Sequence, residues 1–129
     1  MADLEASVVS FALLDADVLS ALGSRFYVDK VPDKPGKPFA KLSQVSPDQR
    51  YTQDGYAGRV VLLQLDVYDD DKARCNSTAE SVKARFDGYR GMMGDIKVGR
   101  CWCKDVRGEW PPDARNFRRI LELEIGTND

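Results

Sequence analysis

An alternation of side chains in the middle of the chain constrains the fold more than any other feature. Between residues 60 and 69, every second residue is apolar, and the set on one face is Val61, Leu63, Leu65 and Val67. Side chains two apart in an extended strand share a face, so this pattern predicts a central β-strand. A chain of 129 residues holds one core of ordinary size, and we expect a single domain over residues 1–129.

The clearest helical pattern follows this strand. Apolar side chains recur there in steps of four and three, at Cys75, Ala79, Val82, Phe86 and Tyr89. Asp69, Asp70 and Asp71 precede them, where the helix macrodipole favours negative charge. Gly88 to Gly91 supplies the stop. The spacing therefore predicts a long helix that starts after Asp71.

The remaining helices and strands have weaker sequence patterns. We expect a helix from about Asp3 to Leu14, a shorter one ending at Gly23, and strands over 25–28, 39–45, 96–103 and 115–125. Three prolines make Val31 to Pro38 a loop. Short connections between the later strands favour an α+β fold, a mostly antiparallel β-sheet with two main helices packed on one face as a two-layer sandwich.

Two of the expected strands carry a face assignment that the structure can test. In the strand over 96–103, one face holds Ile96, Val98, Arg100 and Trp102, and the other holds Lys97, Gly99, Cys101 and Cys103. In the last strand, one face holds Phe117, Leu121, Leu123 and Ile125, and the other holds Arg118, Ile120, Glu122 and Glu124. We expect this second face of the last strand to be exposed to solvent.

Residue types that are missing or scarce exclude several chemistries. The chain has no histidine, which excludes Ser-His-Asp and Cys-His hydrolases and imidazole-bound zinc. Its three cysteines are too few for an all-thiolate zinc site. We interpret Cys101 and Cys103 as two small apolar side chains on a sheet rather than a redox pair. No cofactor is expected.

Two groups of carboxylates could in principle bind a metal ion. Asp66 and Asp69 to Asp71 could bind a divalent cation, but a solvated helix cap is the stronger interpretation. Asp48, Asp95 and Lys97 match the acid and lysine pattern of metal-dependent nucleases. The chain carries 19 Lys and Arg against 21 Asp and Glu, so it lacks the basic surface that nucleic-acid binding normally requires. We assign neither a catalytic nor a metal-binding residue.

The N-terminal residues lack the basic segment and apolar run of an export signal, and we expect a non-exported chain without a membrane span. Aromatic residues in polar segments, Tyr51, Tyr56 and Trp110, fit either of two roles. They are anchors at a protein interface, or they fold back onto the edge of the domain.

Several local strings, in this order, resemble the tail-completion or tail-terminator family of tailed bacteriophages and prophages. The strings are Leu19 to Gly23 running into Arg25 to Tyr27, Pro38 to Ala40, Leu63 to Tyr68, Phe86 to Gly88 after Val82, and Phe117 to Leu123. The resemblance covers most of the chain and rests on packing patterns. The Cys101 to Cys103 string lies outside the family pattern.

The resemblance implies a non-enzymatic virion protein at the neck end of the tail, assembled in the cytoplasm of the bacterial host. It implies a homo-oligomeric ring, a hexamer on assembly, that caps the tail tube and joins it to a head-connector or stopper protein, with DNA passing through its lumen. Interface candidates come from the loops and the last strand: Lys34, Lys37, Gln49, Arg50, Tyr51, Tyr56, Trp110, Arg118, Glu122 and Glu124. The alternatives are another head-tail connector or minor tail protein, and the small nuclease above.

Overall fold

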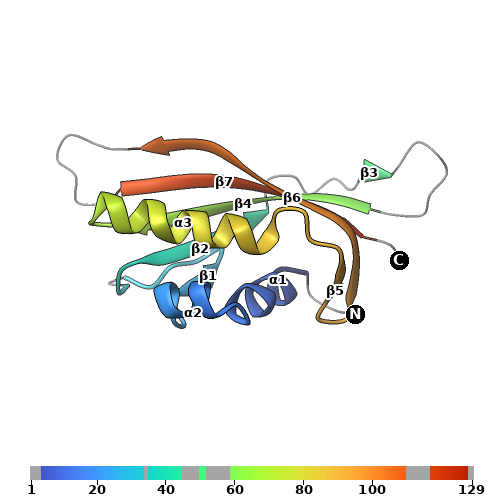
Figure 1. Cartoon of the computed structure of the whole chain (residues 1–129), viewed down its shortest axis with the longest axis horizontal. Coiled ribbons are helices and arrows are strands. Elements are labelled where there is room, and N and C mark those ends of the chain that lie inside the picture. Colours follow the sequence, from blue (N-terminus) through green and yellow to red (C-terminus); the bar gives the residue numbers. More distant parts are fainter. Residues whose placement is uncertain (1–3, 34, 45–49, 52–58, 110–116, 128–129) are drawn as a thin grey trace.

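A computed structural model describes residues 4–33, 35–44, 50–51, 59–109 and 117–127 of the chain. Three helices pack on one side of a seven-stranded sheet (Figure 1). The helices are α1 (Leu4–Leu13), α2 (Ala16–Leu22) and α3 (Lys72–Phe86). The strands are β1 (Phe26–Val28), β2 (Phe39–Gln44), β3 (Arg50–Tyr51), β4 (Arg59–Asp69), β5 (Gly91–Met93), β6 (Ile96–Glu109) and β7 (Phe117–Thr127). This is the expected α+β class, although the sheet curls around the helices instead of lying flat.

The strand order is β1-β2-β4-β7-β6-β5, with β3 paired to β4 beside this path. The expected central strand is confirmed, because β4 pairs with β2 on one side and with β7 on the other. All pairs are antiparallel except β1 and β2, which run parallel with Phe26 opposite Ala40. The short strands β3 and β5 were not expected as strands, since two or three residues carry too little periodicity to be recognised.

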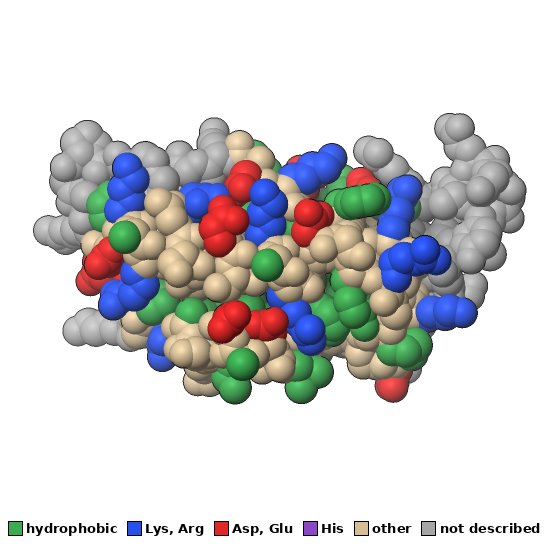
Figure 2. Space-filling view, in the orientation of Figure 1, with side chains coloured by type: hydrophobic (Ala, Val, Ile, Leu, Met, Phe, Trp, Pro, Cys, Tyr) green, Lys and Arg blue, Asp and Glu red, His purple; other side chains and the backbone are tan. Residues whose placement is uncertain are grey.

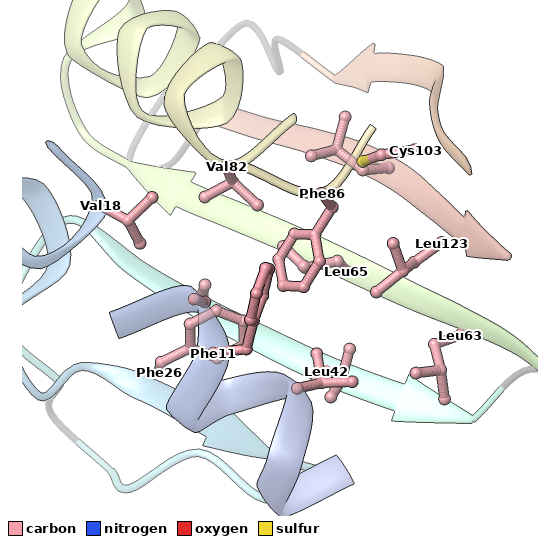
Figure 3. Packing of buried hydrophobic residues seen from close by; sticks show 14 of the residues in the cluster. Phe11, Val18, Phe26, Leu42, Leu63, Leu65, Val82, Phe86, Cys103 and Leu123 are labelled. Atoms are coloured by element: carbon pink, nitrogen blue, oxygen red, sulfur yellow. The ribbon is translucent and has the colours of Figure 1, made fainter. Parts of the chain in front are cut away.

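The core lies between the helices and the sheet, and two aromatic rings mark its centre. Phe86 of α3 is fully buried, and its ring lies 5.6 Å from that of Phe11 in α1. Figure 3 shows both rings between the helices and the strands that carry Leu42, Leu65 and Leu123. The predicted apolar faces of α3 and β4 therefore supply the core.

Side-chain caps fix where the helices start. Asp15 accepts hydrogen bonds from the backbone N–H groups of Asp17 and Val18, at 2.9 and 3.2 Å, and starts α2. Asp71 does the same for α3 through the Arg74 N–H at 3.1 Å. The α2 helix ends at Gly23 with φ of 57°, as the glycine predicted.

The end of α3 lies one residue before the predicted stop at Gly88 to Gly91. The helix stops at Phe86, because Asp87 leaves the helical path and its carboxylate accepts the Cys103 N–H of β6 at 3.1 Å. Tyr89 lies within the predicted stop and continues the apolar spacing of α3, and it packs on Phe11 with ring centroids 4.3 Å apart. Its apolar periodicity therefore indicates burial against α1 beyond the end of the helix.

A bulge in β6 overturns the expected faces of that strand. The register against β7 shifts between Val98 and Arg100. As a result Val98, Cys101 and Cys103 are buried on the helix side, and Trp102 is 45% exposed on the other. The alternation would have placed Trp102 with Val98, but the extra residue, Gly99, reverses the sides.

A polar network ties α3 to the sheet beside the apolar core. Arg119 of β7 donates to Asn76 Oδ1 of α3 at 2.8 Å and pairs with the Asp105 carboxylate of β6. Lys83 of α3 reaches the same carboxylate at 3.2 Å.

Within the described residues, no helix is long and apolar enough to cross a membrane.

Candidate interaction surfaces

No described helix covers the far side of the sheet, which we call the open face (Figure 1). The predicted interface residues Arg118, Glu122 and Glu124 lie on it, and all three are half-buried. The open face is less exposed to solvent than expected, because Ile120 is only 4% exposed and Asp66 is only 2% exposed. Both lie on central strands, where a neighbouring strand on each side shields them.

An ion pair organises one part of the open face. Asp66 of β4 accepts from Arg118 Nη2 of β7 at 3.0 Å and from Gln64 Nε2 at 3.0 Å. The Arg118 guanidinium also lies over the Tyr68 ring, 5.5 Å from its centroid. Tyr68 in turn stacks on Phe39 of β2 at 4.9 Å. Arg118 is therefore held in place by an acid and an aromatic ring.

The remaining charges on this face compensate one another. Arg100 of β6 pairs with Glu124 of β7 at 3.7 Å. Lys104 stands directly opposite Glu122 in the ladder, and Lys41 stands opposite Asp66. Opposite charges in facing positions stabilise neighbouring strands. Strand pairing therefore accounts for the charges of Glu122 and Glu124 within a single chain.

The loop residues proposed as interface anchors are placed only in part. The backbone of Arg50 and Tyr51 forms β3, paired with Val60 and Arg59 of β4. Lys37 is half-buried in the loop before β2. Lys34, Gln49, Tyr56 and Trp110 lie outside the described residues.

The acidic residues before α3 act as a cap and an ion pair. Asp69 is buried and accepts from Arg74 Nε at 2.7 Å, Arg74 Nη2 at 2.7 Å and the Asp71 N–H at 3.2 Å. Burial by itself raises the pKa of Asp69, but these donors outweigh it and leave the pKa below its usual value. In the part of the chain that the structure describes, no three His, Cys, Asp or Glu side chains gather as metal ligands.

The residues of the nuclease alternative lie on an exposed hairpin. Asp95 is in the turn between β5 and β6, and Lys97 follows on β6, both exposed to solvent. Asp48 lies outside the described residues.

All three cysteines are free thiols buried in the core. Burial raises the pKa of Cys101 and of Cys103 to about 12, with Asp87 adding to both shifts. Burial, followed by the charge of Asp69, raises the pKa of Cys75 to about 11. The interpretation of Cys101 and Cys103 as small apolar side chains on one face of a sheet is confirmed.

We expect the three thiols to react with a water-soluble thiol reagent only as the protein unfolds. At pH 8 the thiolate fraction of a group with a pKa of 11 or more is at least about a hundredfold below that of a free cysteine. Labelling should be that much slower in native protein than in concentrated urea, where three thiols per chain should react. Rapid labelling of native protein, or a Cys101–Cys103 disulfide after mild oxidation, would contradict this.

A hollow of about 240 Å³ opens where the segment after α3 passes the start of β6. Its walls include Tyr89, Arg90, Gly99, Arg100 and Trp102. The backbone bond from Gly88 N–H to Cys101 O, 2.8 Å long, holds that segment against the strand. We call this feature the Trp102 hollow. The strict alternation hid this feature because it grouped Trp102 with Val98 on one face, although a glycine inside a strand is a signal for a bulge.

Comparison with known proteins agrees with this architecture. The sequence profile of the family described as "Tail completion protein gp17" matches residues 6–128. A search of curated proteins finds no match. Among solved structures, a chain from a structure described as "Virion of native gene transfer agent (GTA) particle" superposes with a TM-score of 0.71 at 21% identity. That alignment covers 98% of this chain and 95% of the other, so the two share a fold. Because the family profile matches the chain almost from end to end, the chain belongs to the tail completion protein gp17 family.

Proposed function

We propose that this protein closes into a ring on the end of the phage tail tube, stops tube polymerisation and forms the tail side of the head-tail joint. The family match over residues 6–128 carries the proposal, because the family is one of structural tail proteins. The proposed partners are further copies of the chain, in a hexamer on assembly, the tail tube protein and a head-connector protein. The proposed location is the neck end of the virion tail, after assembly in the cytoplasm of the bacterial host.

The fold supports a structural rather than a catalytic role. The buried carboxylate Asp69 is neutralised by Arg74, and the buried thiols have high pKa values, so neither is poised to react. On the open face each of the acids Asp66, Glu122 and Glu124 has a basic residue paired with it or opposite it. Such a face does not attract a polyanion strongly, which suits a ring through which DNA passes without being held.

The direct test removes the protein from the particle. A phage or prophage with a stop codon early in this gene should produce filled heads and separate tails of irregular length. Adding purified protein to that lysate should restore joined particles. Joined particles with tails of normal length in its absence would overturn the proposal.

Two alternatives make different predictions in the same system. For a connector on the head side, labelled protein would stay with the heads when heads and tails are separated. For a nuclease, Asp95→Ala would abolish magnesium-dependent cleavage of DNA. A ring component should tolerate that substitution, because Asp95 lies exposed in a turn.

A further inference from the structure

We propose that the Trp102 hollow receives the α1–α2 corner, residues 14–19, of a second copy of this chain. The contact would repeat from each copy to the next around the ring, so the inference rests on the proposed function and assigns the surfaces that build it. Four properties of the two surfaces support the pairing: exposed apolar side chains, the charge of each surface, the shape of the hollow and the positions of both in the fold.

The α1–α2 corner projects apolar side chains into solvent. Leu14 is 79% exposed and Leu19 is 49% exposed, on either side of the Asp15 cap. The two hydrogen bonds to Asp15 fix the turn, so these leucines are held in place before any partner arrives. Large aliphatic groups held rigidly in water favour burial against another surface at little cost in ordering.

The Trp102 hollow offers the matching apolar surface. The ring of Trp102 forms part of its wall, and the chains of Arg90 and Arg100 border it. Tryptophan and arginine beside a depression are the residues that most often dominate the energy of protein interfaces. A hollow of about 240 Å³ accepts a branched aliphatic side chain such as that of Leu14.

The charges of the two surfaces are opposite. Residues 1–24 contain four acidic residues and no lysine or arginine, and two of the acids are Asp15 and Asp17 at the corner. Residues 88–104, which form the hollow and its surroundings, contain four basic residues and one acid. Figure 2 shows acidic and hydrophobic side chains over α2, and Lys and Arg gathered at the end of the molecule where β5 and β6 meet. Opposite potentials speed association and fix its register.

Two arginines that contact the α1 and α2 helices already have partners in the same chain. Arg25 donates to the Pro38 and Ala21 carbonyls at 2.8 and 3.1 Å. Arg85 donates to the Phe11 carbonyl at 3.0 Å and lies over the Phe11 ring. Asp17, in contrast, is exposed at the corner and can face Arg90 of a neighbour.

The corner and the hollow lie on different parts of the fold. The corner belongs to the helical layer, and the hollow lies between the segment after α3 and the start of β6. A contact between two different surfaces is heterologous, so each copy keeps one free corner and one free hollow. This arrangement does not stop at a dimer, and it gives a ring when the rotation from copy to copy closes.

Two variants break the two surfaces separately. Leu14→Asp removes the apolar corner, and Trp102→Asp disrupts the hollow; both positions are exposed, so the fold should survive, which circular dichroism and thermal melts check. Val106→Asp is the matched control, because Val106 is 52% exposed on β6 but outside the hollow. The measurement is solution mass by light scattering over a range of concentrations.

We expect wild type and Val106→Asp to show masses that rise above the 14.4 kDa of one chain. Leu14→Asp alone and Trp102→Asp alone should each stay monomeric, with self-association weakened at least tenfold. An equimolar mixture of the two should form a heterodimer and stop there, since one intact corner meets one intact hollow. Asp17→Arg mixed with Arg90→Asp, which exchanges the charges, should associate more tightly than either alone.

Three results would overturn the contact. The first is assembly of Leu14→Asp or Trp102→Asp as in wild type, which would leave the ring proposal intact and assign it to other surfaces. The second is a mixture of these variants that remains monomeric. The third is a monomeric wild type at about 1 mM, because binding weaker than that supplies less than about 4 kcal/mol. Failure of the ring itself is judged separately, by the particles formed without the protein.

Discussion

Replacing Phe86 with alanine is expected to lower the free energy of unfolding by about 3–5 kcal/mol. The Phe86 side chain is fully buried at the end of α3 and packs on Phe11, whose ring also contacts Tyr89 and Arg85. Removing it leaves a cavity between α1, α3 and the sheet that these neighbours cannot fill without moving. Urea unfolding at pH 7, followed by circular dichroism, measures the loss.

Two further variants calibrate this result. Phe86→Leu keeps part of the buried apolar volume and should lose less than Phe86→Ala. Ser77→Ala lies on the exposed side of the same helix and should change the unfolding free energy by no more than about 0.5 kcal/mol. A loss below about 1 kcal/mol for Phe86→Ala would show that the ring does not occupy the core as described.

The second large effect is expected at the start of α3, from Asp69→Asn. This change keeps the shape of the side chain but removes the charge that accepts two hydrogen bonds from Arg74 and one from the Asp71 N–H. Hydrogen bonds to a charged partner contribute about 1.5–3 kcal/mol each at most, and a buried amide facing a guanidinium is poorly matched. We expect a loss of about 2–3 kcal/mol at pH 7, measured by urea unfolding.

The same substitution should change the response to acid. The pKa of Asp69 in the folded protein lies below its ordinary value of 3.8, so its contribution is complete above that value and is lost as the pH falls through the folded pKa. The difference between wild type and Asp69→Asn should therefore be largest above pH 5 and shrink below about pH 3.8.

Asp70→Asn is the control for this pair. Asp70 pairs with the same arginine at 3.2 Å but is exposed, so the change should cost less than about 1 kcal/mol. Equal losses for Asp69→Asn and Asp70→Asn at pH 7 would contradict a special role for the buried carboxylate.

The elements with strong periodicity could be predicted from the sequence. Val61 to Val67 and the steps from Cys75 to Phe86 each bury one apolar face, and a single chain pattern suffices to show it. The cap at Asp71 and the stop at Gly23 follow from the chemistry of single residues. These parts depend only on local spacing.

The parts that were missed depend on neighbouring strands. The bulge at Gly99 shifts the register of β6 against β7 and puts Trp102 on the opposite side from Val98. The burial of Asp66 comes from its central position and from Arg118, more than fifty residues away. The parallel pairing of β1 likewise depends on where β2 lies. The burial of Asp66 and the pairing of β1 leave no local pattern, and only the glycine at position 99 signals its feature locally.

The strand order also determines when the protein can fold. β7 lies between β4 and β6, so it alone joins the half of the sheet that contains β1, β2 and β4 to the half that contains β6 and β5. Its ladder with β4 runs from Asp69 opposite Phe117 to Arg59 opposite Thr127, contacts of long sequence separation that slow folding. During synthesis one edge of β4 therefore has no partner strand until residues 117–127 have left the ribosome. Nascent chains that stop before β7 should bind chaperones and be degraded rather than enter tail assembly.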